Sequence, residues 1–390
     1  MLDIIRDYVK KSGSDAWIIY DFAATNPAFS KLFGKIFTTR KLFVIIDIYG
    51  NNTILCHSID APGIRNAEIS KEFSFVTYTN WKELIEKLKA LLSRYKAAMM
   101  EISENGLLPR SSYADYGTVC LINSIIPRIV SSADAFQFLT ATFDGPALES
   151  HKKAALEIDQ IKNEAFDLIS KTIKDKGMVS EYEVQQYILN RFDDFGLVTD
   201  SSPIVAIGTN ANNPHYEPTK SNFSFIRQGD VVLIDLWAKK AEDCGVFADV
   251  TWMGFVGETA PQELVKVFDV VKEAIDSALD YMTKELPNHP VCGYEIDDIC
   301  RKIITDYGYG EYFIHRTGHS ISLGNSDHGV GVNIDNYETH DTRTLINNIA
   351  FSLEPGIYMP SFGLREEINV YISNNMPNVY TPRQEKIVLL

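Results

Sequence analysis

The chain has 390 residues, 45% of them hydrophobic and 23% charged, which is the balance of a soluble globular protein, and its length predicts two domains. The formal net charge of −15 argues against a nucleic acid or an anionic membrane as partner, because phosphate binding needs a clustered basic surface. The five cysteines are widely spaced, and no apolar run approaches the roughly 18 residues of a membrane helix, so we expect a cytoplasmic protein without membrane contact.

Strand-like and helix-like segments alternate in the first part of the chain, which predicts an α/β domain over residues 1–145. The segments expected to form strands are short and apolar: 17–22, 41–47, 53–59, 73–79 and 97–102. Leucines at helical spacing predict a helix over 80–96. None of the strands leads into a glycine-rich phosphate loop, so we assign this domain no cofactor.

The second part, residues 146–390, opens with a long helix that Gly177 ends. Its apolar face is expected to consist of Ala154, Ile158, Ile161, Ala165 and Leu168. A capping box at 180–183 starts a second helix. Two apolar segments, 231–238 and 246–253, follow with a polar turn between them and predict a β-hairpin.

The same order then recurs. Helices are expected over 261–282 and 294–308, followed by strands over 349–358 and 365–372. Two copies of helix, helix and hairpin predict an α+β domain with an internal duplication, its two hairpins packed in one sheet.

Asp235 and Asp249 each place a charge in a strand that should be uncharged if it faces the core. A hairpin that turns at Glu242 puts the two aspartates directly opposite each other, about 5 Å apart on one face. Two ionised carboxylates at that distance raise each other's pKa unless a cation lies between them. The hairpin therefore predicts a metal site.

Glu354 and Glu367 repeat this anomaly in the second hairpin. Four carboxylates and one imidazole form an oxygen-rich set that suits two divalent ions of the manganese, cobalt, iron or zinc type better than a structural zinc. Two such ions can activate a water and polarise a substrate carbonyl. Any one of these acids taken alone is more often the partner of a base such as Arg365 or Lys239.

The segment 315–331, HRTGHSISLGNSDHGVG, contains His315, His319 and His328. The first two are four residues apart, as in helical zinc pairs, but Gly318 and the alternation in HSISL favour a strand or irregular backbone. Only one imidazole of the segment is needed beside the four carboxylates.

The segments DLWAKKAEDCGVFADVTW, HRTGHSISL, FSLEPGIY and GLREEINV resemble the metal-binding segments of the pita-bread metallopeptidases, the family of methionine aminopeptidase, aminopeptidase P, prolidase and creatinase. The order Asp, Asp, His, Glu, Glu is the specific part. The preceding α/β domain resembles the N-terminal domain of the creatinase, prolidase and aminopeptidase P branch.

This resemblance implies a creatinase-like N-terminal domain over 1–145 and a pita-bread catalytic domain over 146–390 with an internal pseudo-twofold repeat. It further implies two divalent metal ions, manganese before cobalt, zinc or iron, and a homodimer. The implied activity is hydrolysis of the bond between an N-terminal residue and proline in short peptides or dipeptides, as in Xaa-Pro aminopeptidases and Xaa-Pro dipeptidases.

Residue by residue, the resemblance implies that the metal ligands are Asp235, Asp249, His319, Glu354 and Glu367. Asp249 and Glu367 would contact both ions, and Glu354 would also carry the proton to the leaving nitrogen. His215 and His328 would be catalytic and substrate-binding residues beside the scissile carbonyl. His315 would line the pocket for proline, and Arg365 would hold the carboxylates in place.

The chain departs from the family pattern in two places. The turn at 239–245 and the loop at 323–327 are longer than usual, which leaves the ligand set intact but changes the shape of the pocket. Two alternatives stay open: an enzyme of the same fold that acts on a small non-peptide molecule, as a creatinase or lyase would, and a catalytically inactive binding homologue.

Overall fold

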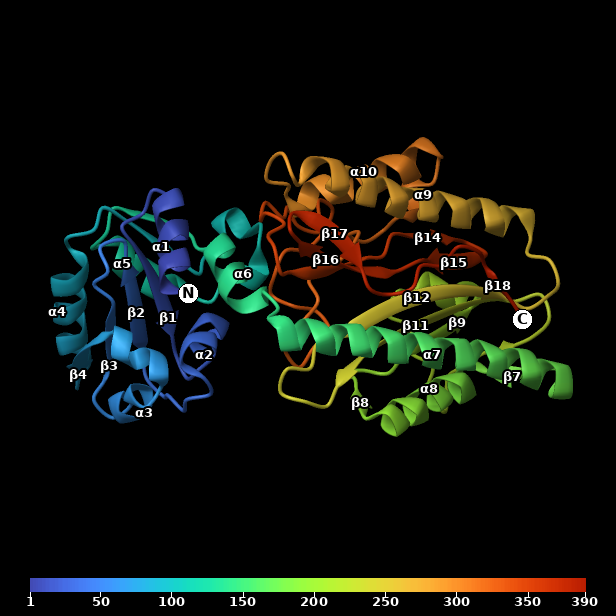
Figure 1. The fold of residues 1–390 in the computed structure, drawn as a ribbon, viewed down its shortest axis with the longest axis horizontal. Coiled ribbons are helices and arrows are strands. Elements are labelled where there is room, and N and C mark those ends of the chain that lie inside the picture. Colours follow the sequence, from blue (N-terminus) through green and yellow to red (C-terminus); the bar gives the residue numbers. More distant parts are fainter. The chain divides into compact units, whose positions relative to one another are not determined.

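The computed structural model describes residues 1–390, which form two compact units, Met1–Thr140 and Ala141–Leu390 (Figure 1). Helix α6 (Ala133–Ala141) ends at the boundary between the units, and α7 (Gly145–Lys176) begins shortly after it. The boundary that we expected between residues 145 and 146 therefore falls in the first turn of α7.

The first unit is built on a six-stranded mixed sheet in the order β4-β3-β2-β1-β5-β6. Its strands are β1 (Ala16–Asp21), β2 (Leu42–Asp47), β3 (Thr53–His57), β4 (Ser74–Tyr78), β5 (Ala97–Met100) and β6 (Arg128–Ser131). Its helices, besides α6, are α1 (Leu2–Lys11), α2 (Pro27–Phe33), α3 (Ala61–Arg65), α4 (Trp81–Leu92) and α5 (Tyr116–Asn123). All five expected strands are present, as is the helix expected over 80–96.

One face of this sheet packs against α4. Leu84, Leu88 and Leu92 are four residues apart, so they share one side of the helix, and all three are buried with Ile18 and other strand residues. The edge strand β6 was not expected. Its side chains are only partly buried, so it lacks the apolar signal that identified the other strands.

In the second unit, Figure 1 shows the central strands between the helix pair α7 and α8 and the pair α9 and α10. The further helices are α8 (Glu181–Phe195), α9 (Gln262–Glu285) and α10 (Gly293–Asp306). The strands are β7 (Val179–Ser180), β8 (Leu197–Val198), β9 (Ile204–Ile207), β10 (Phe225–Ile226), β11 (Val231–Lys240), β12 (Ala248–Phe255), β13 (Ala350–Leu353), β14 (Gly356–Met359), β15 (Phe362–Arg365), β16 (Ile368–Ser373), β17 (Met376–Val379) and β18 (Val388–Leu389).

Local sequence signals explain the start of this unit. Helix α7 ends where Gly177 adopts the left-handed conformation, with φ of 80°. Both hydrogen bonds of the capping box between Ser180 and Glu183 are present at the start of α8. One detail of the expected apolar face is wrong: Leu168 is half-buried, and Ile169 takes the core position because it follows Ala165 by four residues.

The register of the first hairpin differs from the expected one. Asp235 lies opposite Thr251, and Asp249 lies opposite Trp237, so the two aspartates are diagonal neighbours rather than direct partners. The loop after β11 folds back until Gly245 lies against the carbonyl of Lys240, where a Cβ atom would be only 2.3 Å from that oxygen. This moves the centre of the turn beyond Glu242. Because the shift is two residues, both aspartates keep the same face.

The second hairpin is interrupted where two long strands were expected. Segment 349–358 forms β13 and β14 with a break at Glu354–Pro355, and segment 365–372 forms β15 and β16. Proline has no N–H to donate to the ladder, which accounts for the break. Leu353 pairs with Ile368 and Gly356 with Arg365 in one continuous register, so Glu354 stands opposite Glu367.

The two hairpins do not share one hydrogen-bonded sheet, contrary to expectation. Strands β11 and β12 belong to a five-stranded sheet, whereas β16 belongs to the three-stranded sheet β13-β16-β17. The sheets meet edge to edge, where the Glu367 amide donates to the Thr251 carbonyl at 3.1 Å. The break in the second hairpin prevents a longer ladder, but it leaves the acidic residues of both hairpins side by side.

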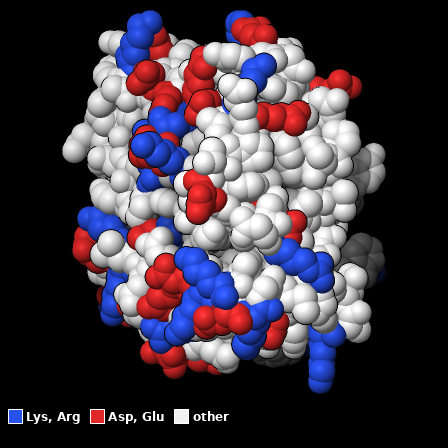
Figure 2. Space-filling model, turned by 90° about the vertical axis from the view of Figure 1, so that its right-hand side faces the viewer, with Lys and Arg blue, Asp and Glu red and all other residues white.

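No helix combines the length and the apolar character that crossing a membrane requires. On the face drawn in Figure 2, Lys and Arg side chains are interspersed with Asp and Glu side chains.

Candidate metal centre and substrate cavity

A cavity of about 420 Å³ in the second unit brings together all nine residues predicted for the site. These residues are His215, Asp235, Asp249, His315, His319, His328, Glu354, Arg365 and Glu367. They come from β11, β12, β15, the link between β15 and β16, the segment 315–328, the break between β13 and β14, and the turn that follows the short 3-10 helix Gly208–Asn212. Residues separated by more than 100 positions in the chain thus face one space.

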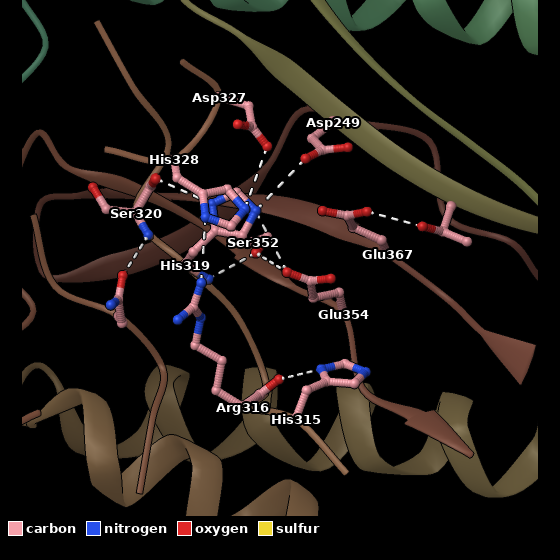
Figure 3. A network of polar contacts seen from close by, with 12 residues as sticks. Asp249, His315, Arg316, His319, Ser320, Asp327, His328, Ser352, Glu354 and Glu367 are labelled. Atoms are coloured by element: carbon pink, nitrogen blue, oxygen red, sulfur yellow. Dashed lines mark hydrogen bonds and ion pairs between the residues drawn. The ribbon is translucent and has the colours of Figure 1, made fainter. Parts of the chain in front are cut away.

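Imidazole and carboxylate groups converge on the centre of this cavity (Figure 3). His319 Nε2 lies 3.6 Å from Asp249 Oδ2 and 3.4 Å from Glu354 Oε1. Asp249, His319 and Glu367 each offer one ligand atom, and these three atoms all lie within 4.8 Å of one another. The arrangement is compact enough for these three side chains to share a metal ion.

The carboxylates of this centre are buried beside one another. Asp249 is 3% exposed and Glu367 is 2% exposed. Burial first, and then the neighbouring carboxylates, raise the pKa of Asp249 and the pKa of Glu367 well above their ordinary values. The pKa values of Asp235 and Glu354 are raised as well, chiefly by burial. The acids therefore need additional positive charge to be ionised together.

Three carboxylate oxygens of this centre have no hydrogen-bond partner although they are buried: Asp235 Oδ1, Asp249 Oδ1 and Glu367 Oε1. Buried polar atoms are normally satisfied, and an unsatisfied anionic oxygen is costly. Divalent ions of the hard and borderline classes prefer such oxygens together with an imidazole. The five predicted ligands thus fit a metal centre.

Arg365 supplies part of the missing positive charge. Its guanidinium pairs with Asp235, and its Nε donates to Thr251 Oγ1 at 3.1 Å. The Thr251 hydroxyl in turn donates to Glu367 Oε2 at 3.0 Å. Arg365 and Thr251 therefore orient one carboxylate from each hairpin.

The backbone and the ring of His319 are both held in place. Its amide donates to Ser352 Oγ at 2.9 Å. Its Nδ1 lies 3.2 Å from the Ser320 carbonyl, which can only accept, so Nδ1 carries the proton and Nε2 keeps its lone pair. That lone pair is on the side of Asp249 and Glu354, as metal binding requires.

His315 has a different environment. Its Nδ1 donates to the Arg316 carbonyl at 2.7 Å, and its Nε2 lies 2.7 Å from the Tyr358 hydroxyl. Burial first, and then the nearby Arg365, lower the pKa of His315 to about 3. Both nitrogens are engaged within the protein, so His315 presents mainly ring surface to the cavity.

His328 and His215 reach the cavity from separate segments. The His328 ring stacks on that of His319 with centroids 3.8 Å apart. Its Nδ1 lies 3.3 Å from Arg316 Nη2, and its Nε2 lies 3.4 Å from Asp327 Oδ2. His215 lies in an exposed turn, where its amide donates to Asn213 Oδ1 at 3.1 Å.

Several cavity residues were not predicted from the sequence. Trp237, Arg316, Asp327 and Glu338 all line the cavity. Trp237 follows Asp235 by two residues in one strand, so strand alternation could have placed it on the same face. Asp327 immediately precedes His328, but it was considered only as part of a longer loop. No feature of the sequence indicated that Glu338 would reach the cavity.

Glu338 is brought to the cavity by a local turn. The Asp335 carboxylate accepts hydrogen bonds from the following amides, including that of Glu338 at 2.9 Å. Glu338 Oε2 then lies 3.1 Å from Arg316 Nη1. The position of this acid depends on a side-chain-to-backbone turn that simple hydrophobic periodicity does not reveal.

Comparison with known proteins identifies relatives of the chain. The chain is 28% identical over 219 residues to a putative Xaa-Pro aminopeptidase of Mycoplasma genitalium, covering 53% of this chain and 56% of the relative. It is 28% identical over 248 residues to the Xaa-Pro dipeptidase of Lactobacillus delbrueckii subsp. lactis, covering 61% and 59%. The matched stretches thus span less than two thirds of these relatives' own lengths.

Among solved structures, the Xaa-Pro dipeptidase from Bacillus anthracis matches over 100% of this chain and 99% of its own, with a TM-score of 0.62 and 22% identity. This likeness confirms the expected fold class, an α/β domain followed by a pita-bread domain. The family model of Metallopeptidase family M24 matches residues 149–374, more than half of the chain. The chain therefore belongs to metallopeptidase family M24.

Proposed function

We propose that the chain is a metal-dependent exopeptidase that cleaves the bond between an N-terminal residue and proline. The observation that carries the proposal is the convergence of Asp249, His319 and Glu367, with buried carboxylate oxygens that lack partners. The names of the relatives support the substrate class.

In this proposal five side chains would hold two divalent ions: Asp235, Asp249, His319, Glu354 and Glu367. Asp249 and Glu367 would serve both ions. The oxygen-rich set favours manganese, with cobalt, zinc and iron as ions that the same ligands accept. When bound, the ions supply Lewis-acid polarisation of the scissile carbonyl and lower the pKa of a water molecule.

The remaining steps belong to the side chains of the cavity. Glu354 accepts the proton of the attacking water and transfers it to the leaving nitrogen, and its Oε1 accepts a hydrogen bond from Ser352 Oγ at 3.1 Å. His215 and His328 donate to the carbonyl oxygen as its negative charge grows. His315 offers ring surface to proline, and Arg365 keeps the Asp235 carboxylate in place.

A substrate with proline second fits this arrangement. The proline nitrogen carries no N–H once it is in a peptide bond, so a protease that binds its substrate through that donor is disadvantaged. A site that recognises the free amino terminus and the proline ring does not need this donor. A cavity of about 420 Å³ is of the size that holds a short peptide or dipeptide. We also expect a homodimer, by resemblance to the family, and a cytoplasmic location, in keeping with five cysteines that form no disulfide.

The test begins with the purified chain stripped of metal and then supplied with manganese. We expect hydrolysis of Xaa-Pro dipeptides and Xaa-Pro-Yaa tripeptides, whose relative rates separate a dipeptidase from an aminopeptidase. Asp249→Asn and Glu367→Gln should each lose bound metal, and their activity should fall more than about 100-fold. Replacing a residue that only orients a metal ligand costs less than this.

The matched control is Asp243→Asn, which removes an exposed acid from the loop between β11 and β12. It should retain metal and activity. Absence of turnover on every proline substrate would refute the proposed activity, and full activity in Asp249→Asn or Glu367→Gln would refute the ligand assignment.

A further inference from the structure

The two places where the chain is longer than the family pattern touch each other. Lys239 Nζ donates to the Gly324 carbonyl and lies 5.2 Å from the centroid of the Phe247 ring. The Phe247 amide donates to the Ser322 carbonyl at 3.4 Å. The loop 323–327 is thereby fastened to the β11–β12 hairpin, and Asp327 at its end is held in the wall of the cavity.

Asp327 lies beside the metal centre, where its carboxylate and the imidazoles of His319 and His328 offer ligand atoms that all lie within 4.8 Å of one another. Figure 3 shows its carboxylate and that of Asp249 pointing toward the stacked rings of His319 and His328. The Asp327 side chain is 15% exposed, and its ion-pair contact is with His328. The nearby loop contact of Lys239 is with the Gly324 carbonyl.

An aromatic surface accompanies this acid. Trp237 lines the cavity, and its Nε1 donates to Asp200 Oδ1 at 2.8 Å. The indole and the Asp327 carboxylate thus line one cavity, and a cation is favoured both by carboxylates and by an aromatic ring.

The net charge of the whole cavity also favours the binding of a cation. Seven carboxylates and two guanidinium groups line it. Arg365 pairs with Asp235 and Arg316 with Glu338, so both guanidinium groups are already engaged. Two bound divalent ions and these two guanidinium groups would supply six positive charges, whereas the seven ionised carboxylates supply seven negative charges. An incoming positive group would restore the balance.

We propose that Asp327, in the cavity that the Trp237 indole also lines, binds a cationic group of the substrate. This inference rests on the proposed function. The group is either the α-ammonium of the N-terminal residue or the ammonium or guanidinium of a basic first side chain. Recognition of the α-ammonium would limit cleavage to one residue from the end, whereas recognition of a side chain would select Lys or Arg as the first residue.

The test compares wild type with Asp327→Asn, which removes the charge at nearly constant shape. The probes are Ala-Pro, Arg-Pro, Lys-Pro and N-acetyl-Ala-Pro, and the measurement is kcat/KM. If the α-ammonium is bound, kcat/KM falls about 10-fold, the equivalent of about 1.4 kcal/mol, for all three free dipeptides. If the side chain is bound, that fall is confined to Arg-Pro and Lys-Pro.

Asp327→Glu should keep most of the effect because it keeps the charge. Asn325→Ala is the matched control in the same loop, since Asn325 is exposed and does not line the cavity. Unchanged kcat/KM for every substrate in Asp327→Asn would overturn the inference while leaving the proposed function intact. Loss of bound metal in that variant would make Asp327 a metal ligand and would also overturn it. Absence of turnover by wild type would remove the proposed function, and this inference with it.

Discussion

The Nε2 atom of His315 lies 2.7 Å from the hydroxyl oxygen of Tyr358, and the direction of this hydrogen bond is fixed by its surroundings. His315 Nδ1 donates to a backbone carbonyl, so Nε2 can only accept, and Tyr358 is the donor. The same hydroxyl oxygen accepts from Arg365 Nη1 at 3.1 Å. Tyr358 therefore joins a histidine of the cavity to the arginine that holds Asp235.

Tyr358→Phe should destabilise the protein and loosen the metal centre. It leaves a buried histidine nitrogen without its donor, which costs about 1–3 kcal/mol of unfolding free energy. Because Arg365 also loses an acceptor, metal affinity should fall about 10-fold or more. Urea unfolding and metal titration measure the two effects. Tyr371→Phe is the control, since it removes a hydrogen bond to Asn348 in the same unit but should leave metal affinity unchanged.

The stability of the metal-free protein should fall as pH rises. The folded-state pKa values of Asp249 and Glu367 lie well above the ordinary 3.8 and 4.5, so above those values the folded state holds protons that the unfolded state has released. Stability is then present at low pH and is lost as pH rises through the folded pKa values. Bound metal should cancel this loss.

Denaturant unfolding above about pH 7.5 isolates the effect, because buried histidines with lowered pKa values are then largely neutral in the unfolded state as well as in the folded state. The metal-free Asp249→Asn variant should show a shallower fall than metal-free wild type. A metal-free wild type whose stability rises over this range would contradict the prediction.

Replacing the substrate-side histidines should lower turnover without removing metal. For His328→Gln and His215→Asn we expect kcat to fall about 100-fold, the typical cost of losing one donor to a developing oxyanion. Metal analysis should give wild-type occupancy in both. His289→Gln, on an exposed histidine outside the cavity, is the control. Loss of metal in His328→Gln would instead assign that imidazole to the metal centre.

Gly318→Ala should disturb the metal centre through the backbone. A Cβ atom at this position would lie 1.9 Å from the carbonyl oxygen of Ser352, the residue whose hydroxyl accepts from the His319 amide. The two segments must move apart, at a cost of about 1–3 kcal/mol. Thermal unfolding and metal titration should both show the loss. Gly145→Ala, where a Cβ meets nothing within 4 Å, is the control.

The sequence was informative where a residue conflicts with its surroundings. Asp235, Asp249 and Glu354 could be found because each is an acid in an apolar segment of the sequence. Their precise pairing could not be found, because strand periodicity sets the face of a residue but the turn sets the register. The fold-back at Gly245 shifted the first hairpin by two residues, which periodicity cannot detect.

Other features depend on contacts between distant segments. Arg316 and Glu338, which were not predicted, are 22 residues apart in the sequence and form a hydrogen bond. The sequence around neither residue indicates this pair. The sequence marked the loop ending in Asp327 as unusual, but only the contact of Lys239 with that loop explains where Asp327 is held. Propensity and spacing thus predicted the elements and the ligand candidates, whereas the walls of the cavity required tertiary structure.

The break at Pro355 has a consequence for how the chain folds. It leaves the Glu354 amide outside the ladder, and this amide donates to the Thr317 carbonyl at 2.7 Å, in the segment that carries His319. The Glu367 amide likewise donates to Thr251, beside Asp249. Each bond joins parts of the chain that are far apart in sequence, and such contacts form slowly because long loops must close first. The arrangement of the metal ligands should therefore be among the last features to form during folding. Metal would then bind after the two hairpins of the second unit have packed together.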